Sequence, residues 1–223
     1  MMLAAFAQPV FDSQRTFREL LQAMARPAVP RPLPVLPPAP APITPAAMAI
    51  LLTLCDATTS VWLQQPDEEA IRHLRFHAGI KLAQQPREAD FALITDPLSM
   101  PPLGAFAHGD LRYPDRSASL ILQVAAFDSS PCAQGEAGRG CSDVASSQEW
   151  ATPPQPSPAN SGGSRFGGPG IRDSATLAID GLAHDFWQQR AALAEQLPLG
   201  IDLYFVAAQQ IVCLPRTTRM LEG

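Results

Sequence analysis

Several features that mark other classes of protein are missing from this sequence. No run of 18 apolar residues occurs, so a membrane-spanning helix is not expected. The chain has no basic residue before Arg15, which argues against a secretory signal peptide. The four cysteines show no CxxC spacing, and Cys55 and Cys213 lie in apolar runs that are typical of buried thiols. We therefore expect a reduced, cytoplasmic protein.

The sequence patterns of common catalytic and cofactor sites are also missing. There is no Gly-Lys-Ser/Thr phosphate loop, no Gly-x-Ser-x-Gly elbow and no HExxH pair. The run from Gly167 to Gly170 is GGPG rather than GxGxxG, and its proline removes a donor that a phosphate loop would need, so we interpret it as a tight turn. Cys132 and Cys141 have no further ligand at zinc spacing, and the i, i+4 pair His73 and His77 lacks a carboxylate signature. No catalytic residue and no metal site is predicted.

Composition and charge describe an ordinary globular protein. With 223 residues, 46% of them hydrophobic and 17% charged, the chain can bury a sizeable core as one large domain or two small ones. A net charge of −5 and a pI near 5.3 argue against binding nucleic acid or an anionic membrane as the main role.

Helical periodicity predicts three helices in the first third of the chain. The first runs from about Asp12 to Ala25, and its apolar stripe, spaced i, i+3, i+4, i+7, is expected to face the core: Phe17, Leu20, Leu21 and Met24. The second begins at Thr44-Pro45, where threonine is a good cap and proline a good first residue. The third opens at Pro66-Asp67 and ends at Gly79.

Short apolar runs predict strands between and after these helices. The proline-rich stretch from Pro27 to Pro45 allows at most an edge strand near Val29–Val35. One further helix is predicted at His184–Gln196, and the predicted strands are Thr59–Leu63, Phe91–Thr95, Leu120–Phe127, Ala175–Ile179 and the two arms of a final hairpin, Ile201–Val206 and Gln210–Leu214. Strands that alternate with helices indicate an α/β fold with three αβα layers, and the hairpin makes its sheet mixed.

Residues 128–163 interrupt this pattern. They are rich in Ser, Pro, Gly, Ala and Gln, and their few large apolar side chains cannot offset the entropy of ordering them. We expect a disordered insertion within a single domain that spans residues 1–223. Its two ends are expected to be the arms of a β-hairpin.

Candidate binding residues lie at the end of the chain and on two of the helices. Asp202 opens the final hairpin, and Pro215 is followed by Arg216, Thr217 and Thr218, whose guanidinium and hydroxyl groups match a phosphate or a partner's carboxylate. The alternative is an ordinary surface turn.

Three further polar residues, Arg18, Arg75 and His77, lie off the predicted core stripes, where a solvated helix face is the default and a partner or anion site is the alternative. We expect these helix residues to cluster on the surface with Arg216.

Six segments, in order, resemble the H subunit of the bacterial carbon–phosphorus lyase system. They are DSQRTFRELLQAMARPAVP (Asp12–Pro30), LLTLCDATTSVWL (Leu51–Leu63), LRFHAG (Leu74–Gly79), SASLILQV (Ser117–Val124), GPGI (Gly168–Ile171) and PLGIDL with LPRTT (Pro198–Thr218). The chain departs from the family pattern at Ala28, where a glycine is usual, in its proline-rich stretch, and in the insertion.

The resemblance implies a specific role and fold. The family's H subunit forms homodimers and joins the G, I and J subunits in a core complex, alpha-D-ribose 1-methylphosphonate 5-triphosphate synthase, which replaces the adenine of ATP by an alkylphosphonate. The resemblance implies a fold similar to the large domain of pyridoxal-phosphate-dependent transferases, without that cofactor. A Schiff base needs a lysine, and Lys81 is the one lysine of the chain, with no motif around it.

Two functions follow as hypotheses. The first is an accessory, non-catalytic subunit of that complex, with ATP as a substrate of the complex. The second is an autonomous enzyme that binds a nucleotide or phosphonate through Arg75, His77, Asp202 and Arg216. The shortage of proton-transfer groups at fixed spacing favours the first.

Overall fold

A computed structural model describes residues 3–128 and 163–221. Its centre is a seven-stranded sheet, in the order β1 (Arg31–Pro32), β10 (Gln210–Leu214), β9 (Asp202–Ala207), β5 (Ser119–Gln123), β4 (Phe91–Ile94), β2 (Ser60–Leu63) and β3 (Lys81–Leu82). The five strands from β9 to β3 are parallel, whereas β10 and β1 are antiparallel to their neighbours. The mixed α/β sheet is confirmed, as is the edge strand in the proline-rich stretch. Among the described residues, no helix is long and apolar enough to cross a membrane.

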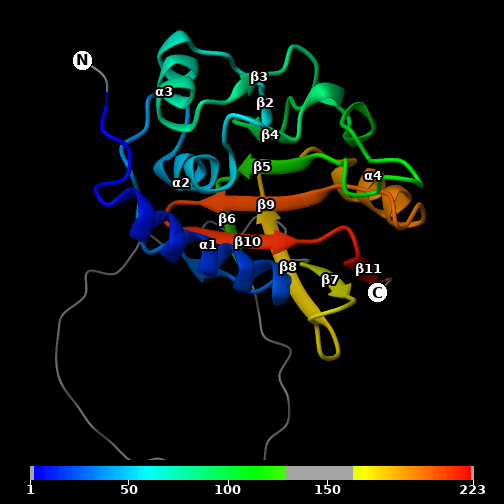
Figure 1. Cartoon of the computed structure of the whole chain (residues 1–223). Helices are drawn as coiled ribbons and strands as arrows, with labels where there is room; N and C mark the ends of the chain where they lie inside the picture. The colour runs from blue at the N-terminus through cyan, green and yellow to red at the C-terminus, as the bar shows by residue number, and fades with distance from the viewer. Residues whose placement is uncertain (1–2, 129–162, 222–223) are drawn as a thin grey trace, which may run out of the picture.

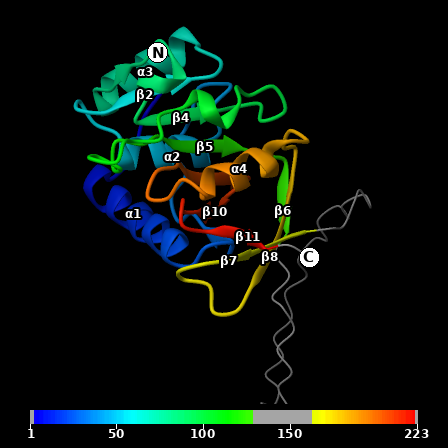
Figure 2. The ribbon, with the colours of Figure 1, turned by 90° about the vertical axis from the view of Figure 1, so that its right-hand side faces the viewer.

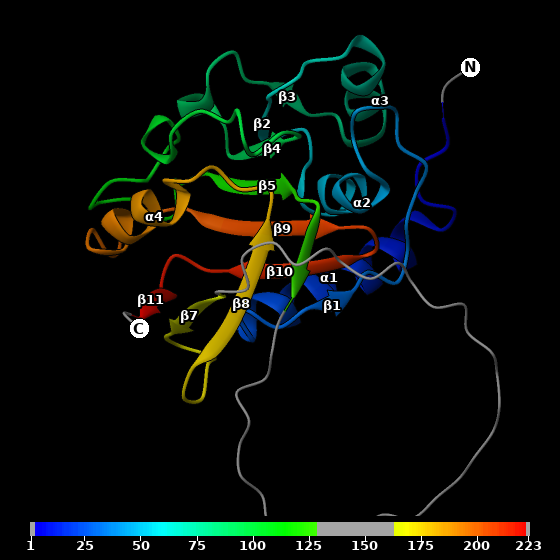
Figure 3. The ribbon, with the colours of Figure 1, turned by 180° about the vertical axis from the view of Figure 1, so that it is seen from behind.

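Layers of different composition cover the two faces of this sheet. Three helices lie on one face, α1 (Pro9–Ala25), α2 (Pro45–Leu54) and α3 (Glu68–Ala78), as Figure 1 shows. The other face carries α4 (Phe186–Ala194), which contacts the short turn η2 (Leu103–Ala105). A second sheet crosses this face in the order β11 (Arg219–Leu221), β7 (Ser164–Gly167), β8 (Ala175–Asp180) and β6 (Ala126–Asp128). Another short turn, η1 (Pro86–Glu88), connects β3 to β4. Figure 3 shows β6 and β8 crossing the large sheet from behind, and Figure 2 shows β7 and β11 gathered below α4. The three layers are present, but the second outer layer contains strands as well as a helix.

The cap predicted for α2 and the two ends predicted for α3 are confirmed. Thr44 Oγ1 accepts the Ala47 N–H at 3.3 Å, and α2 then runs between α1 and α3 with the residues from Ala46 to Leu51 all buried. Asp67 caps α3, and Gly79 ends it in a left-handed conformation with φ of 70°. These local signals fix the helix ends because they satisfy backbone groups that a helix leaves unpaired.

The prediction for α1 is wrong in its start and in half of its core stripe, since Leu20 is buried and Met24 packs against the core as predicted. The helix begins at Pro9, and Asp12 lies inside it, where its Oδ2 accepts the Gln8 N–H at 2.9 Å. Phe17 and Leu21, which were expected in the core, are 48% and 55% exposed. The side that packs on the protein is formed by smaller or polar residues and one leucine: Asp12, Thr16, Leu20 and Ala23. These smaller side chains suit a close approach to the buried α2.

The segment around the insertion also differs from the prediction. The apolar run expected as one strand divides at Val124-Ala125 into β5 of the large sheet and β6 of the small one. Strands β6 and β7 pair with opposite edges of β8 and not with each other, so they are not the arms of one hairpin. Residues 129–162, where the disordered insertion was predicted, lie outside the described residues.

The final hairpin is confirmed, with the turn reduced to Ala208 and Gln209 between the paired residues Ala207 and Gln210.

The structure also shows what the alanine at position 28 means, where the resembled family usually has glycine. Ala28 is buried and its φ is 63°, a left-handed conformation in which glycine is unstrained.

Candidate functional site

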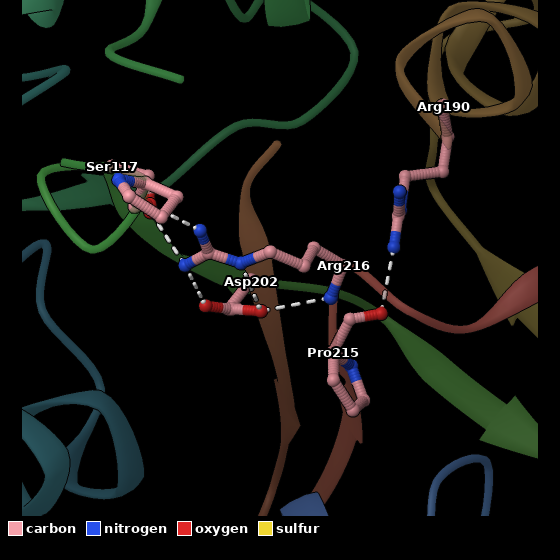
Figure 4. A network of polar contacts seen from close by, with 6 residues as sticks. Ser117, Arg190, Asp202, Pro215 and Arg216 are labelled. Atoms are coloured by element: carbon pink, nitrogen blue, oxygen red, sulfur yellow. Dashed lines mark hydrogen bonds and ion pairs between the residues drawn. The ribbon is translucent and has the colours of Figure 1, made fainter. Parts of the chain in front are cut away.

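A network of hydrogen bonds surrounds Arg216, at the point where β10 ends. The Arg216 N–H donates to Asp202 Oδ1 at 2.8 Å, and its Nη2 donates to Asp202 Oδ2 at 2.6 Å. The same guanidinium donates to Pro114 O at 2.6 Å and to Ser117 Oγ at 2.5 Å (Figure 4). Both charged side chains are about one-fifth exposed. Arg216 therefore ties the start of β9 and the end of β10 to the loop that precedes β5.

Arg190, which comes from α4, holds the following loop from the other side. Its Nη2 donates to Pro215 O at 2.8 Å (Figure 4) and also to Thr218 O at 3.4 Å. The side chain is buried, with 4% exposure, and burial lowers the pKa of Arg190 to about 10, an effect that Asp202 opposes and Arg216 reinforces. The Asp202 carboxylate, which pairs with Arg216, thus also favours the charged form of Arg190.

This geometry changes the interpretation of the final loop. The Arg216 donors predicted to bind an anion or a partner are already used inside the protein. Thr218 is buried at 3% exposure, whereas Thr217 is exposed. Outside this loop lies a groove of about 550 Å³, whose lining includes Gly167, Gly168, Asp173, Leu197, Thr217 and Arg219. Thr217 is thus the predicted residue that reaches an accessible surface here.

The α3 residues form a separate surface. Arg75 is exposed and lines, with the 70% exposed Phe76, an open groove of about 560 Å³. His77 Nε2 lies 3.1 Å from Leu3 O, and its ring is 4.5 Å from that of the buried His73. Burial lowers the pKa of His73, and the neighbouring His77 lowers it further. The residues that the structure describes contain no group of three or more potential metal ligands.

The predicted surface cluster does not form. Arg18 is exposed on α1, which packs beside β10, whereas Arg75 and His77 lie on α3, which connects β2 to β3 at the opposite edge of the sheet. Three strand spacings, or about 14 Å, separate β9, which carries Asp202, from β2. The four-residue site of the autonomous-enzyme hypothesis is therefore divided into an Asp202–Arg216 pair and a distant helix.

Arg190 is the residue of this network that sequence reasoning missed. A signal was present, since Arg190 lies four residues after Phe186 and three before Leu193, on the apolar side of the predicted helix. A cation on the buried side of a helix needs acceptors, and the carbonyls at the end of β10 supply them.

The buried thiols are not nucleophiles. Burial raises the pKa of Cys55 to about 12 and raises the pKa of Cys213 well above its usual value. A thiol that stays protonated at neutral pH is a poor nucleophile and a poor metal ligand. Within residues 3–128 and 163–221, the site thus offers a rigid tie and accessible polar surfaces, without a nucleophile paired to a base.

The comparisons with known proteins agree with one another. The sequence model of a family described as bacterial phosphonate metabolism protein (PhnH) matches residues 4–221. The chain is 33% identical over 218 residues to "Alpha-D-ribose 1-methylphosphonate 5-triphosphate synthase subunit PhnH" of Rhizobium meliloti (strain 1021), which covers 97% of this chain and 94% of the relative. It is also 38% identical over 56 residues to the "Putative C-P lyase subunit protein HtxG" of Stutzerimonas stutzeri, which covers 25% of this chain and 29% of that protein.

Proposed function

The chain belongs to the PhnH family of bacterial phosphonate metabolism proteins, and from this premise we propose that it is a non-catalytic subunit of a carbon–phosphorus lyase core complex. The observation that carries the proposal is the 33% identity, over 97% of the chain, to a protein named as a subunit of the ribose methylphosphonate triphosphate synthase. Identity along the whole chain favours the same place in the same kind of assembly.

The proposed reaction belongs to the complex. ATP and an alkylphosphonate yield a ribose 1-alkylphosphonate 5-triphosphate, as adenine leaves and a phosphonate oxygen takes its place on the ribose. We assign the chemistry to the I subunit and a supporting role to this chain, which joins G, I and J subunits as a homodimer in the cytoplasm.

The chemistry of the described residues supports an accessory role. Each nitrogen of the Arg216 guanidinium donates to an internal acceptor, and Asp202 is occupied by the same contacts. General acid–base catalysis needs a titratable group within reach of the substrate, and internal hydrogen bonds already engage this pair.

No cofactor is proposed for this subunit, including pyridoxal phosphate. Lys81 is the one lysine of the chain, and it lies exposed on β3, the edge strand of the sheet. A Schiff base lysine works in an enclosed site that holds the cofactor phosphate and ring. The proposed fold similarity to the large domain of pyridoxal-phosphate-dependent transferases therefore concerns architecture alone.

Titration and co-purification test this proposal together. We expect ATP and methylphosphonate to give no saturable signal with the isolated chain at micromolar concentration, and the tagged chain to co-purify with co-expressed G, I and J subunits. Micromolar ATP binding by the isolated chain would favour an autonomous enzyme, and a chain that never joins the other subunits would refute the accessory role.

A further inference from the structure

The outward side of α1 is apolar. Val10, Phe17 and Leu21 are 78%, 48% and 55% exposed. Their spacing, i, i+7, i+11, places them on one line along the helix, because seven residues make about two turns. Over its 17 residues α1 is about 25 Å long. The exposed Gln14 lies on the same line, between Val10 and Phe17, and the exposed Arg18 flanks the line on one side. We call these five residues the α1 outer face.

The sequence of α1 thus differs from that of an ordinary surface helix. Its packed side contains Asp12, Thr16 and Ala23 beside Leu20, while two of its larger apolar side chains, Phe17 and Leu21, face water. Exposed apolar side chains that are contiguous, unlike scattered ones, mark a surface that another molecule covers. The periodicity of the helix is that of a buried stripe, and residues 3–128 and 163–221 do not bury it.

The charges beside the stripe are of one sign. Arg18 is exposed beside the stripe and Arg15 is exposed further round the helix, whereas the two acidic residues of the helix are engaged elsewhere. Asp12 is buried and accepts the Gln8 N–H, and Glu19 forms an ion pair with Arg31 at 2.7 Å. The α1 outer face is therefore cationic in a chain whose net charge is −5.

We infer that the α1 outer face docks an amphipathic segment of a partner subunit whose apolar side chains are flanked by carboxylates. The inference rests on the proposed function, which supplies other subunits as partners. A second copy of this chain fits the face less well, because a two-fold antiparallel contact centred on Phe17 brings Arg18 close to Arg18 of the copy. Like charges at a contact are repulsive, whereas acidic flanks are attracted. A homodimer would then use a different surface.

Co-purification of the full chain with co-expressed G, I and J subunits tests the inference. The test variants are Phe17→Ser with Leu21→Ser, which removes the apolar stripe, and Arg18→Glu, which reverses its flank. Leu111→Ser, at an 81% exposed leucine, and Arg87→Glu, at an exposed arginine, are the matched controls. We expect each test variant to weaken association with the other subunits at least tenfold while its thermal midpoint stays unchanged. The two control variants should associate as the wild type does, and Arg18→Lys should retain binding. Added salt should weaken the association of the wild type.

The outcomes separate this inference from the proposed function. If the wild type and both test variants assemble equally, the α1 outer face is not the docking site, while the subunit role stands. If the wild type itself fails to assemble, both fall. If the isolated chain is a dimer, and the double variant Phe17→Ser with Leu21→Ser is a monomer, then a second copy of the chain covers the α1 outer face. That result would overturn the inference.

Discussion

Replacing Arg216 by glutamate removes the tie between the two ends of the terminal hairpin and the loop before β5. The side chain donates to Asp202, to Pro114 O and to Ser117 Oγ, and the backbone N–H that also donates to Asp202 is kept in the variant. The change therefore removes the contacts of the guanidinium. It also places a second carboxylate beside Asp202.

The loss can be worked out from these contacts. The hydrogen bonds to Pro114 O and Ser117 Oγ contribute about 1 kcal/mol each, and the ion pair, about one-fifth exposed, contributes about 1 to 2 kcal/mol. Adding the repulsion between two carboxylates, we expect Arg216→Glu to lower the free energy of unfolding by about 4 kcal/mol. For a chain of this length that is a fall in thermal midpoint of about 10 °C.

Thermal unfolding followed by circular dichroism measures the effect on the isolated protein. Arg216→Lys keeps the charge and loses the forked geometry, so its midpoint should fall by about half as much. Arg87→Glu is the control for charge reversal at an exposed site and should leave the midpoint unchanged. If Arg216→Glu unfolds within about 2 °C of the wild type, Arg216 is a surface residue and our account of the network is wrong.

Further predictions concern other parts of the chain. Cys55 and Cys213, whose pKa values are raised by burial, should resist a thiol reagent until denaturant is added, as peptide mapping would show. Because the pKa of His73 is lowered by burial, the native state favours the neutral imidazole and loses stability as pH falls below the usual pKa of 6.5. In His73→Leu, the free energy of unfolding measured with urea should therefore depend less on pH between about pH 7 and about pH 5 than it does in the wild type. Ala28→Gly relieves a left-handed φ and should raise stability by about 0.5 to 1 kcal/mol in the same assay. A linker that replaces residues 129–162 has to join β6 to β7 across β8, which lies between them, and two strand spacings make this distance about 10 Å. A linker of about six Gly/Ser residues should therefore preserve the thermal midpoint, whereas a two-residue turn should lower it.

Local chemistry explains why much of the fold was predictable from the sequence. Thr44-Pro45 and Asp67 satisfy helix N–H groups within a few residues, and the β-prone runs of the final hairpin need only a short turn. Such signals do not depend on what lies elsewhere in the chain. The elements that they fix were correct to within about three residues.

The predictions failed where contacts with another part of the chain, rather than the local sequence, determine how a segment folds or packs. The periodicity of α1 identifies its apolar side but not what covers it, so Phe17 and Leu21 were assigned to a core that they do not join. Pairing of β6 and β7 with the two edges of β8 depends on contacts distant in sequence. For the candidate site, Arg216 and Asp202 were identified, but the Arg216 guanidinium turned out to donate to Asp202 itself and to Pro114 O and Ser117 Oγ, about a hundred residues earlier in the chain.

The most direct test of the central claim is phosphonate-dependent adenine release by the other core subunits, measured without and then with the purified chain. An accessory subunit predicts low release by the partners alone, restoration when the chain is added, and none from the chain by itself. Full release in its absence, or release by the isolated chain, would contradict the proposed role.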